Sequence, residues 1–401
     1  MRTVEEHQRV VAGLITARAP QDVPLAQAEG LALAADVVAP LSLPRFDNSA
    51  MDGYAVLAED ISAASAETPV KLPVAEDIPA GRTDPLTLSP GTAHRIMTGA
   101  PLPAGATAVI PVEATDAGTE TVEIRASANV GQHIRTAGED VQAGTAVLRA
   151  GQVVTPAALG LAAALGLGTL TVRPKLRVLV MSTGTELVAP GTPLQPGQIY
   201  ESNAVMLAAA VREAGAEVVA APMASDDVDE FRAALRGHLE DADLVITTGG
   251  VSAGAYEVVK DALGGEVDFT KVAMQPGMPQ GAGRVAGVPI VTLPGNPVSA
   301  LVSFEVFVRP ALREAMGLPH ADRPQRDAVL TEDCTSPSGK RQFRRGVLSV
   351  DGSGGATVTS YGPPASHHLR WLASANCLLV IPEDVTAIAA GSTVRVWDLD
   401  G

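Results

Sequence analysis

Residues 243–254 read DLVITTGGVSAG, and residues 292–299 read TLPGNPVS. Each segment begins with an apolar run typical of a buried strand and ends in Gly or Pro residues, where backbone can approach a ligand closely. Ligands of open α/β sheets bind at the carboxyl ends of the strands. The two segments therefore predict one binding site at a shared edge of a sheet.

Strand-like and helix-like segments alternate on both sides of these two loops. The pattern predicts strands at 176–181, 216–221, 243–247, about 267–273 and 288–293, and helices at 203–214, 228–239, 255–263 and 298–316. Ser202 or Asn203 can cap the first of these helices, and Asp226 or Asp227 the second. Such alternation predicts a parallel sheet covered on both faces by helices.

The remaining segments are richer in short β-like runs. Residues 57–150 carry such runs between Gly and Pro residues and predict a small all-β domain, and residues 319–401 predict a second one. Helices are expected at 3–19, 25–35 and 155–167, the last capped by Thr155. Residues 45–56, RFDNSAMDGYAV, are typical of a connecting loop when judged on composition alone.

Composition narrows the classes of function. The formal net charge of −16 argues against nucleic-acid binding, which needs a basic surface. Cys334 and Cys377 have neither CxxC nor metal-ligand spacing, so free thiols in a reducing compartment are expected. The start of the chain lacks the apolar region of a signal peptide, and prolines interrupt the one long uncharged stretch. A cytoplasmic protein without membrane contact is predicted.

The loop at residues 250–254 allows two chemical interpretations. Gly250-Val251-Ser252-Ala253-Gly254 matches the GxSxG pattern of a serine-hydrolase elbow, which requires a tight turn directly after the strand. Here two glycines follow the strand, and the later histidines lie outside the predicted α/β domain. A glycine-rich loop that donates N–H groups to a phosphate explains the residues better. No GxGxxG or P-loop motif supports nucleotide binding.

Acidic residues recur in the predicted loops. Mg²⁺ prefers one or two carboxylates together with water and substrate phosphates, and solvated surface acids are the alternative. The loop acids are Asp52, Asp140, Glu186, Asp226, Asp227 and Glu257.

Seven motifs occur together in one order along nearly the whole chain. They are FDNSAMDGYAV, RIMTGAPLP, AGEDV, STGTEL, PGQIYESNAVML, TTGGVSAG and LPGNPVSA. In this combination the chain resembles the molybdopterin molybdenumtransferase (MoeA) family, which includes the E domain of gephyrin. The resemblance implies an elongated, multi-domain α/β plus β chain that forms a homodimer, with an active cleft involving both protomers.

The resemblance also implies four domains per chain. They are an N-terminal linking domain at 1–45 and 140–174, a β insertion domain at 46–139, a central parallel α/β domain similar to MogA at 175–318, and a small β-barrel-like domain at 319–401.

The implied activity is insertion of molybdate into adenylylated molybdopterin in a Mg²⁺-dependent step, giving molybdenum cofactor and AMP. The implied partners are a second copy of the chain, a molybdopterin adenylyltransferase and molybdoenzymes that accept the cofactor. Two alternatives stay open: a non-catalytic scaffold of the same fold, and a molybdopterin adenylyltransferase, against which the extra β domains and residues 45–56 argue.

Carried over onto this sequence, the family's functional residues fall into three sets. The catalytic set is Asp52, Thr98, Asp140, Glu186, Asp226 and Lys271. The set that binds the pterin is Gly249, Gly250, Ser252, Pro294, Asn296, Pro297, Ser299 and Ser366. The magnesium set is Asp226, Asp227 and Glu257.

The chain departs from the family pattern at two places. Residues 275–279 read QPGMP where many members read KPGKP, so Gln275 and Met278 replace two lysines. The change removes two positive charges that would neutralise an oxyanion. Lys271, Arg284 and Arg345 are the candidates to replace them, and a weaker affinity for molybdate is the alternative. Glu257 stands where many members have Asp and gives the carboxylate a longer reach.

Overall fold

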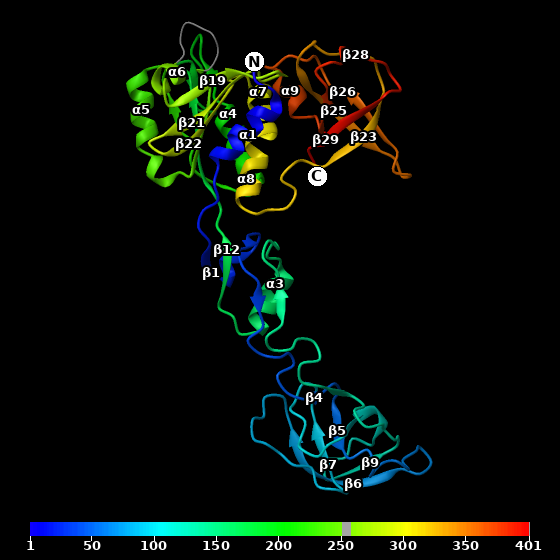
Figure 1. The fold of residues 1–401 in the computed structure, drawn as a ribbon. Coiled ribbons are helices and arrows are strands. Elements are labelled where there is room, and N and C mark those ends of the chain that lie inside the picture. The colour runs from blue at the N-terminus through cyan, green and yellow to red at the C-terminus, as the bar shows by residue number, and fades with distance from the viewer. Residues whose placement is uncertain (251–257, 401) are drawn as a thin grey trace. The chain divides into compact units, whose positions relative to one another are not determined.

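The computed structural model describes residues 1–250 and 258–400 (Figure 1). Its elements belong to two units, and each unit is described by itself. Unit 1 contains residues 1–21, residues 30–34 and the chain from Thr171 onward; unit 2 contains Asp22–Glu29 and Ala35–Leu170. The division into four domains stays a prediction.

A seven-stranded sheet forms the centre of unit 1. Its strand order is β16-β13-β18-β22-β21-β19, and β17 also pairs with β13. The strands are β13 (Arg177–Thr183), β16 (Glu217–Ala220), β17 (Met223–Ala224), β18 (Leu244–Thr248), β19 (Val267–Lys271), β21 (Pro279–Val285) and β22 (Val288–Leu293). Strands β16, β13, β18 and β22 run parallel to one another, as the sequence predicts.

The predicted parallel sheet is wrong at one edge, where the sheet is antiparallel. Strand β21 pairs antiparallel with β22 and with β19. Ala286 and Gly287, with φ of 48° and 86°, connect β21 to β22 in a two-residue turn, as in hairpins with two left-handed residues. The pattern missed β21 because it carries Gly281, Ala282 and Gly283, which are uncommon in strands.

Helices cover both faces of this sheet, as predicted. One face is covered by α1 (Val4–Leu14), α4 (Asn203–Glu213), α7 (Pro297–Ser303), the π-helical turn η3 (Phe304–Val308) and α8 (Arg309–Ala315); the other by α5 (Val228–Arg236) and α6 (Val258–Leu263) (Figure 1). Alternate strand residues fill the two cores, because neighbouring side chains on a strand point to opposite faces. Val178 and Val180 belong to the first core, and Leu179 and Met181 to the second.

The last part of unit 1 is a small closed barrel, which confirms the predicted C-terminal β domain. Its strand order is β20-β25-β26-β23-β29-β27, and an additional β25–β27 pairing closes it. The strands are β20 (Met274–Gln275), β23 (Gln325–Leu330), β25 (Arg341–Val350), β26 (Ala356–Ser360), β27 (Cys377–Ile381) and β29 (Thr393–Asp398). The short elements beside it are β24 (Cys334–Thr335), β28 (Ala387–Ile388) and α9 (Leu369–Leu372).

Unit 2 contains the predicted all-β region. Its main sheet has the order β8-β5-β7-β6-β9. The strands are β5 (Gly53–Val56), β6 (Val70–Ile78), β7 (Ala93–Ile96), β8 (Ala108–Pro111) and β9 (Thr121–Ile124). The smaller elements are α2 (Leu25–Ala28), β3 (Val37–Val38), β4 (Asn48–Ser49), η1 (Val112–Ala114), β10 (Ile134–Arg135), β11 (Ala146–Leu148) and α3 (Pro156–Ala164).

Two local predictions for this half of the chain need correction. The helix expected at 25–35 ends at Ala28, and the chain then forms β2 (Ala32–Leu33). Residues 45–56 are more than a connecting loop, because β4 and β5 lie within them and Tyr54 is fully buried. The cap predicted for α3 is confirmed, since Oγ1 of Thr155 accepts a hydrogen bond from the Ala158 N–H.

Both cysteines are buried and unpaired, as expected from their spacing. Burial raises the pKa of the Cys377 thiol to about 12, so this thiol stays protonated and unreactive near neutral pH. In the described ranges, no helix has both the length and the apolar character needed to span a membrane.

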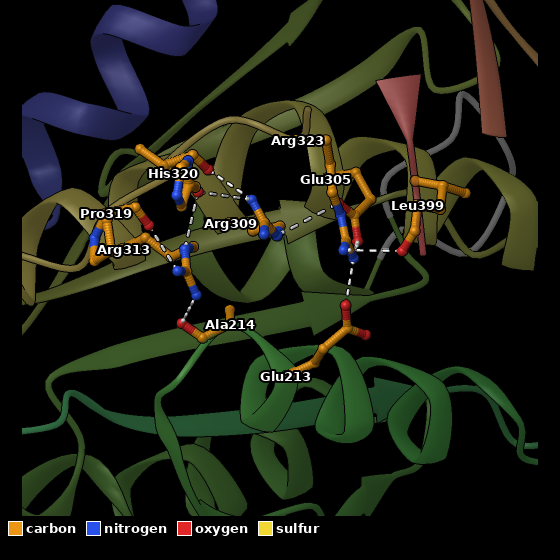
Figure 2. Close-up of polar contacts among 10 residues, drawn as sticks. Glu213, Ala214, Glu305, Arg309, Arg313, Pro319, His320, Arg323 and Leu399 are labelled. Carbon is orange, nitrogen blue, oxygen red and sulfur yellow. Dashed lines mark hydrogen bonds and ion pairs between the residues drawn. The ribbon is translucent and has the colours of Figure 1, made fainter. Parts of the chain in front are cut away.

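A buried cluster of charges joins the helical layer of unit 1 to the end of its barrel (Figure 2). Glu305, 4% exposed, accepts hydrogen bonds from Nε and Nη2 of Arg323 at 2.8 and 3.0 Å. Nη2 of Arg323 also donates to Glu213 of α4 at 2.6 Å, and its Nη1 to the Leu399 carbonyl at 3.0 Å. Arg309 lies 3.8 Å from Glu305. Glu305 therefore compensates buried positive charge on the helix–barrel contact.

His7 gives the fold a predictable dependence on pH. It is fully buried beside Phe307, and its Nδ1 lies 3.2 Å from Nη1 of Arg2. Burial, aided by the charge of Arg2, lowers the pKa of His7 to about 4. The unfolded chain therefore binds a proton that the folded chain does not between pH 6.5 and 4, so stability falls as pH falls through this window. We expect a loss of about 3 kcal/mol in the free energy of unfolding.

Urea unfolding at pH 7 and pH 4.5 checks this expectation. His7→Leu removes the titrating group while keeping an apolar side chain, so its stability should fall less over the same interval. An equal fall in both proteins would contradict the assignment of the pH dependence to His7.

Candidate functional site

A cavity of about 1020 Å³ lies in unit 1 at the carboxyl ends of β13, β18 and β22. Its walls are the loops that follow these strands, the segment from β14 (Leu187–Val188) to β15 (Ile199–Tyr200) before α4, residues 275–279, and a segment that precedes and enters α9. The site predicted from the strand-end loops is therefore present as a single hollow, and its size suits a ligand of several rings.

The glycines after β18 let two strand-end loops come together. Gly249 has φ of 97°, and its N–H donates to the Leu293 carbonyl at 3.3 Å. A Cβ at this position would lie 2.7 Å from the carbonyl oxygen of Thr183, closer than real side chains approach. Gly250 has φ of 63°, and a Cβ there would lie 2.9 Å from Val259. Both positions require glycine, and the close approach leaves backbone rather than side chains facing the cavity.

The structure brings nearly all of the predicted pterin-binding residues together. Those that line the cavity are Gly249, Gly250, Pro294, Asn296, Pro297, Ser299 and Ser366. Ser252 lies outside the described residues. Ser366 reaches this site from the barrel part of the chain, where its carbonyl accepts a hydrogen bond from the Val298 N–H at 3.0 Å. Their role in binding stays a prediction.

Two neighbouring acids on the loop before α5 have different surroundings. Asp226 lines the cavity, and its Oδ2 accepts hydrogen bonds from the N–H and the hydroxyl of Thr185, both at 3.0 Å. Asp227 is the N-cap of α5, as the sequence predicts, and its Oδ1 accepts from the N–H groups of Asp229 and Glu230 at 3.0 and 2.9 Å. Asp226 is therefore the acid at the cavity, whereas Asp227 caps α5.

Three predicted catalytic residues belong to unit 2. Oδ1 of Asp52 accepts hydrogen bonds from the Thr98 N–H at 2.6 Å and from its hydroxyl at 2.7 Å. These two bonds, the hydroxyl first, lower the pKa of Asp52 and keep the carboxylate charged. Asp140 is exposed on a turn whose N–H groups bond to the Leu43 carbonyl. The motifs that contain Asp52 and Thr98 thus form one local pair.

Several residues of the cavity received no functional prediction. Thr183, Tyr200, Glu201 and Asn203 all line it. Nδ2 of Asn203 donates to Oγ1 of Thr248 and to the Gly295 carbonyl, while its Oδ1 is buried without a partner among the described residues, as is Oγ1 of Thr183. Buried polar atoms normally have partners, so both are available to a ligand. The motif PGQIYESNAVML was the available signal: it contributed to the family resemblance and to a predicted helix start, but none of its residues was assigned a binding role.

The described residues that line the cavity include Glu186, Glu201 and Asp226 but no Lys or Arg. Gln275 and Met278, which stand at the two lysine positions of the family pattern, are both in the lining.

The side chains considered as replacements are engaged or placed elsewhere. Lys271 is an exposed residue of β19 that does not line the cavity. Arg284 donates to the carbonyls of Gly287 and Leu14, and Arg345 to those of His368 and Pro363. The catalytic role of Lys271 stays a prediction.

The donor set is compatible with Mg²⁺ bound together with a substrate. Within residues 1–250 and 258–400, no group of three or more His, Cys, Asp or Glu side chains lies close enough together to hold a metal. Glu257, the third predicted ligand, lies outside the described residues. Asp226 receives both Thr185 bonds on Oδ2, and no bond to its Oδ1 occurs among the described residues. One or two carboxylates with substrate phosphate and water suit Mg²⁺.

Known protein families and relatives match this chain over nearly its whole length. Three family models match: "MoeA N-terminal region (domain I and II)" at residues 2–166, "Probable molybdopterin binding domain" at 179–314, and "MoeA C-terminal region (domain IV)" at 327–399. A protein named molybdopterin molybdenumtransferase 2 of Mycobacterium tuberculosis is 70% identical, over 100% of both chains. Molybdopterin molybdenumtransferase 1 of the same organism is 40% identical, over 99% of this chain and 98% of its own.

Solved structures agree with the sequence relatives. A crystal structure of the molybdopterin biosynthesis MoeA protein from Pyrococcus horikosii matches with a TM-score of 0.83 and 31% identity, over 100% of this chain and 99% of the other. The fold and the matched domains define a protein of molybdenum cofactor biosynthesis. The chain belongs to the MoeA family, the molybdopterin molybdenumtransferases.

Proposed function

We propose that this chain inserts molybdate into adenylylated molybdopterin, releasing AMP and molybdenum cofactor. Family membership makes the chain a transferase of molybdenum cofactor biosynthesis. The observation that carries the specific reaction is the cavity at the strand ends of the segment matched as a probable molybdopterin binding domain. Its volume of about 1020 Å³ accommodates a pterin together with a nucleotide.

The chain's own groups act by orientation and electrostatics, because the metal–sulfur chemistry belongs to the substrates. The backbone at Gly249 and Gly250 and the loop from Pro294 to Ser299 hold the substrate. Asn203 and Thr183 direct unpaired buried oxygens at it. Molybdate enters beside the dithiolene, and one of its oxygens attacks the phosphorus of the molybdopterin phosphate, so that the phosphoanhydride bond breaks with AMP as the leaving group. That oxygen stays on the phosphorus when its bond to molybdenum breaks, and the two dithiolene sulfurs bind the metal as their protons pass to the remaining molybdate oxygens.

Mg²⁺ is proposed as the cation at this site. Asp226 would hold it, with Glu257 as the other predicted ligand, and it would supply positive charge against the substrate phosphates. Asp227, the third residue of the predicted magnesium set, has its capping role at α5 instead. Since no Lys or Arg occurs in the described lining, a cation is the simplest source of that charge.

The proposed assembly is a cytoplasmic homodimer in which Asp52, Thr98 and Asp140 complete the cleft of a second protomer. Two free buried thiols are consistent with a reducing compartment. A molybdopterin adenylyltransferase would supply the substrate, and molybdoenzymes would accept the product.

Molybdate-dependent AMP release from adenylylated molybdopterin tests the proposed reaction. Glu186 lines the cavity on the loop after β13, and its carboxylate folds over Gly184. Because it contributes charge to the reacting region, Glu186→Ala should lower the rate of AMP release about tenfold or more. Glu240→Ala, on a surface turn outside the cavity lining, is the control. Unchanged turnover in Glu186→Ala would remove this residue from the mechanism.

A complementation experiment separates the enzyme from a scaffold of the same fold. A strain without its own molybdenumtransferase should regain molybdoenzyme activity when it expresses this chain. No recovery from a well-expressed, folded protein would favour the scaffold.

A further inference from the structure

Apolar side chains remain exposed on two walls of the cavity. Ile199 and Tyr200 of β15 (Ile199–Tyr200) are 54% and 44% exposed, and Leu369 at the start of α9 is 38% exposed. All three line the cavity. Large apolar side chains that stay exposed within a hollow are typical of a ligand surface.

The Tyr200 ring is fixed before any ligand arrives. Its hydroxyl donates to the Thr192 carbonyl at 2.8 Å. Its strand pairs in parallel with β14 (Leu187–Val188), and the N–H groups of Ile199 and Glu201 donate to the Glu186 and Val188 carbonyls, both at 2.9 Å. A ring held in place loses little conformational freedom on binding.

The next residue anchors this strand to the sheet. Glu201 is 4% exposed, and its Oε1 accepts from the Ser182 hydroxyl at 2.8 Å and from the Ala204 N–H at 2.6 Å. The carboxylate thus ties the segment to the end of β13 and to the first turn of α4. The aromatic face rests on rigid elements.

The negative charge of the cavity lining indicates that an aromatic ring of the ligand contributes more to binding affinity than its phosphate does. Its described lining carries Glu186, Glu201 and Asp226 without Lys or Arg, so the anionic part of a ligand gains little there unless a cation accompanies it. A flat heteroaromatic ring needs no such compensation, because it stacks on an aromatic face.

We propose that Tyr200 forms an aromatic shelf that takes a planar fused heteroaromatic ring of the substrate, with Ile199 and Leu369 as further apolar residues of the cavity lining. Tyr200 is its specificity-determining residue. The inference rests on the proposed function, whose substrate carries two such rings, a pterin and an adenine. Aliphatic phosphates lack a π-face and would gain little from Tyr200.

Direct binding to the full-length chain tests the shelf without turnover. Binding of AMP is followed by calorimetry and binding of free pterin by its fluorescence, each with Mg²⁺ and without molybdate. Tyr200→Ala should weaken binding of at least one probe about tenfold or more. Tyr200→Phe, which keeps the ring but not the Thr192 bond, should stay within about threefold of the unmodified chain. Val350→Ala, a 50% exposed residue outside the cavity, is the control.

The two probes locate the ring. Loss confined to AMP places adenine on the shelf, and loss confined to pterin places the pterin there; both support the proposal. Tyr200→Ala binding both probes as well as the unmodified chain would overturn it, as would an unmodified chain that binds neither. Molybdate-dependent AMP release, measured in parallel, distinguishes this proposal from the proposed reaction. Turnover without Tyr200-dependent binding would contradict the shelf alone, and Tyr200-dependent binding without turnover would contradict the reaction alone.

Discussion

Replacing Asp226 with asparagine should lower the rate of molybdate-dependent AMP release about 100-fold or more. Asparagine keeps the size of the side chain and an oxygen that can accept both Thr185 hydrogen bonds. It removes the negative charge that a cation needs in a cavity whose described lining has no Lys or Arg. The residual rate should rise as Mg²⁺ is increased, because the defect lies in holding the ion.

Asp227→Asn makes a sharp comparison, since the two acids are adjacent. Asn caps helices about as well as Asp, so α5 should keep its cap and turnover should change less than about threefold. Equal losses in the two variants would contradict the separation of a ligand-facing acid from a capping acid. Normal turnover in Asp226→Asn would remove that residue from the proposed site.

The second large effect is expected at the buried charge cluster. Glu305→Ala should lower the free energy of unfolding by about 3–5 kcal/mol, because it leaves buried Arg323 and Arg309 without their shared carboxylate (Figure 2). Burial, together with repulsion from Arg323 and Arg313, lowers the pKa of Arg309, whereas at Arg323 hydrogen bonds and attraction from Glu305 and Glu213 outweigh burial and raise the pKa.

Urea unfolding at pH 7, followed by far-UV circular dichroism, measures this effect. Glu213→Ala is the matched control: its carboxylate also accepts a hydrogen bond from Arg323, but it is 58% exposed and its loss leaves both bonds from Arg323 to Glu305, so a loss of about 1 kcal/mol is expected. If the Glu305→Ala protein were as stable as the control, the prediction would be wrong, because water or another group would then balance the buried charges of the two arginines.

The sequence allowed most of unit 1 to be predicted, because buried parallel strands and amphipathic helices leave clear periodic patterns. Strand β21 was not predicted, because Gly281 and Gly283 are uncommon in strands. It forms through pairing with a neighbouring strand rather than through local propensity. In unit 2, strand β5 within residues 45–56 was not predicted, because the Asp, Asn and Ser residues of this stretch indicated a turn.

The structure brings the predicted loop residues to one cavity where their location depends on the backbone. Gly249 and Pro294 lie on loops whose location follows from strand ends alone. Side chains whose role depends on three-dimensional neighbours were not predicted: Asn203 was expected only as a helix cap, and Tyr200 had no assigned role. Asp226 and Asp227 were both predicted as magnesium ligands and as possible caps of α5, and their hydrogen bonds and the cavity lining distinguish them.

The pairing of β2 with β12 (Thr169–Arg173) has a consequence for protein engineering. Leu33 pairs with Val172, and the Ala34 N–H donates to the Thr171 carbonyl at 2.9 Å. The chain thus leaves for the long segment Ala35–Leu170 and returns from it at neighbouring points of one ladder. A tight turn joining Ala34 to Thr171 would excise that segment in a single genetic splice, giving a minimal module that retains every described residue of the cavity.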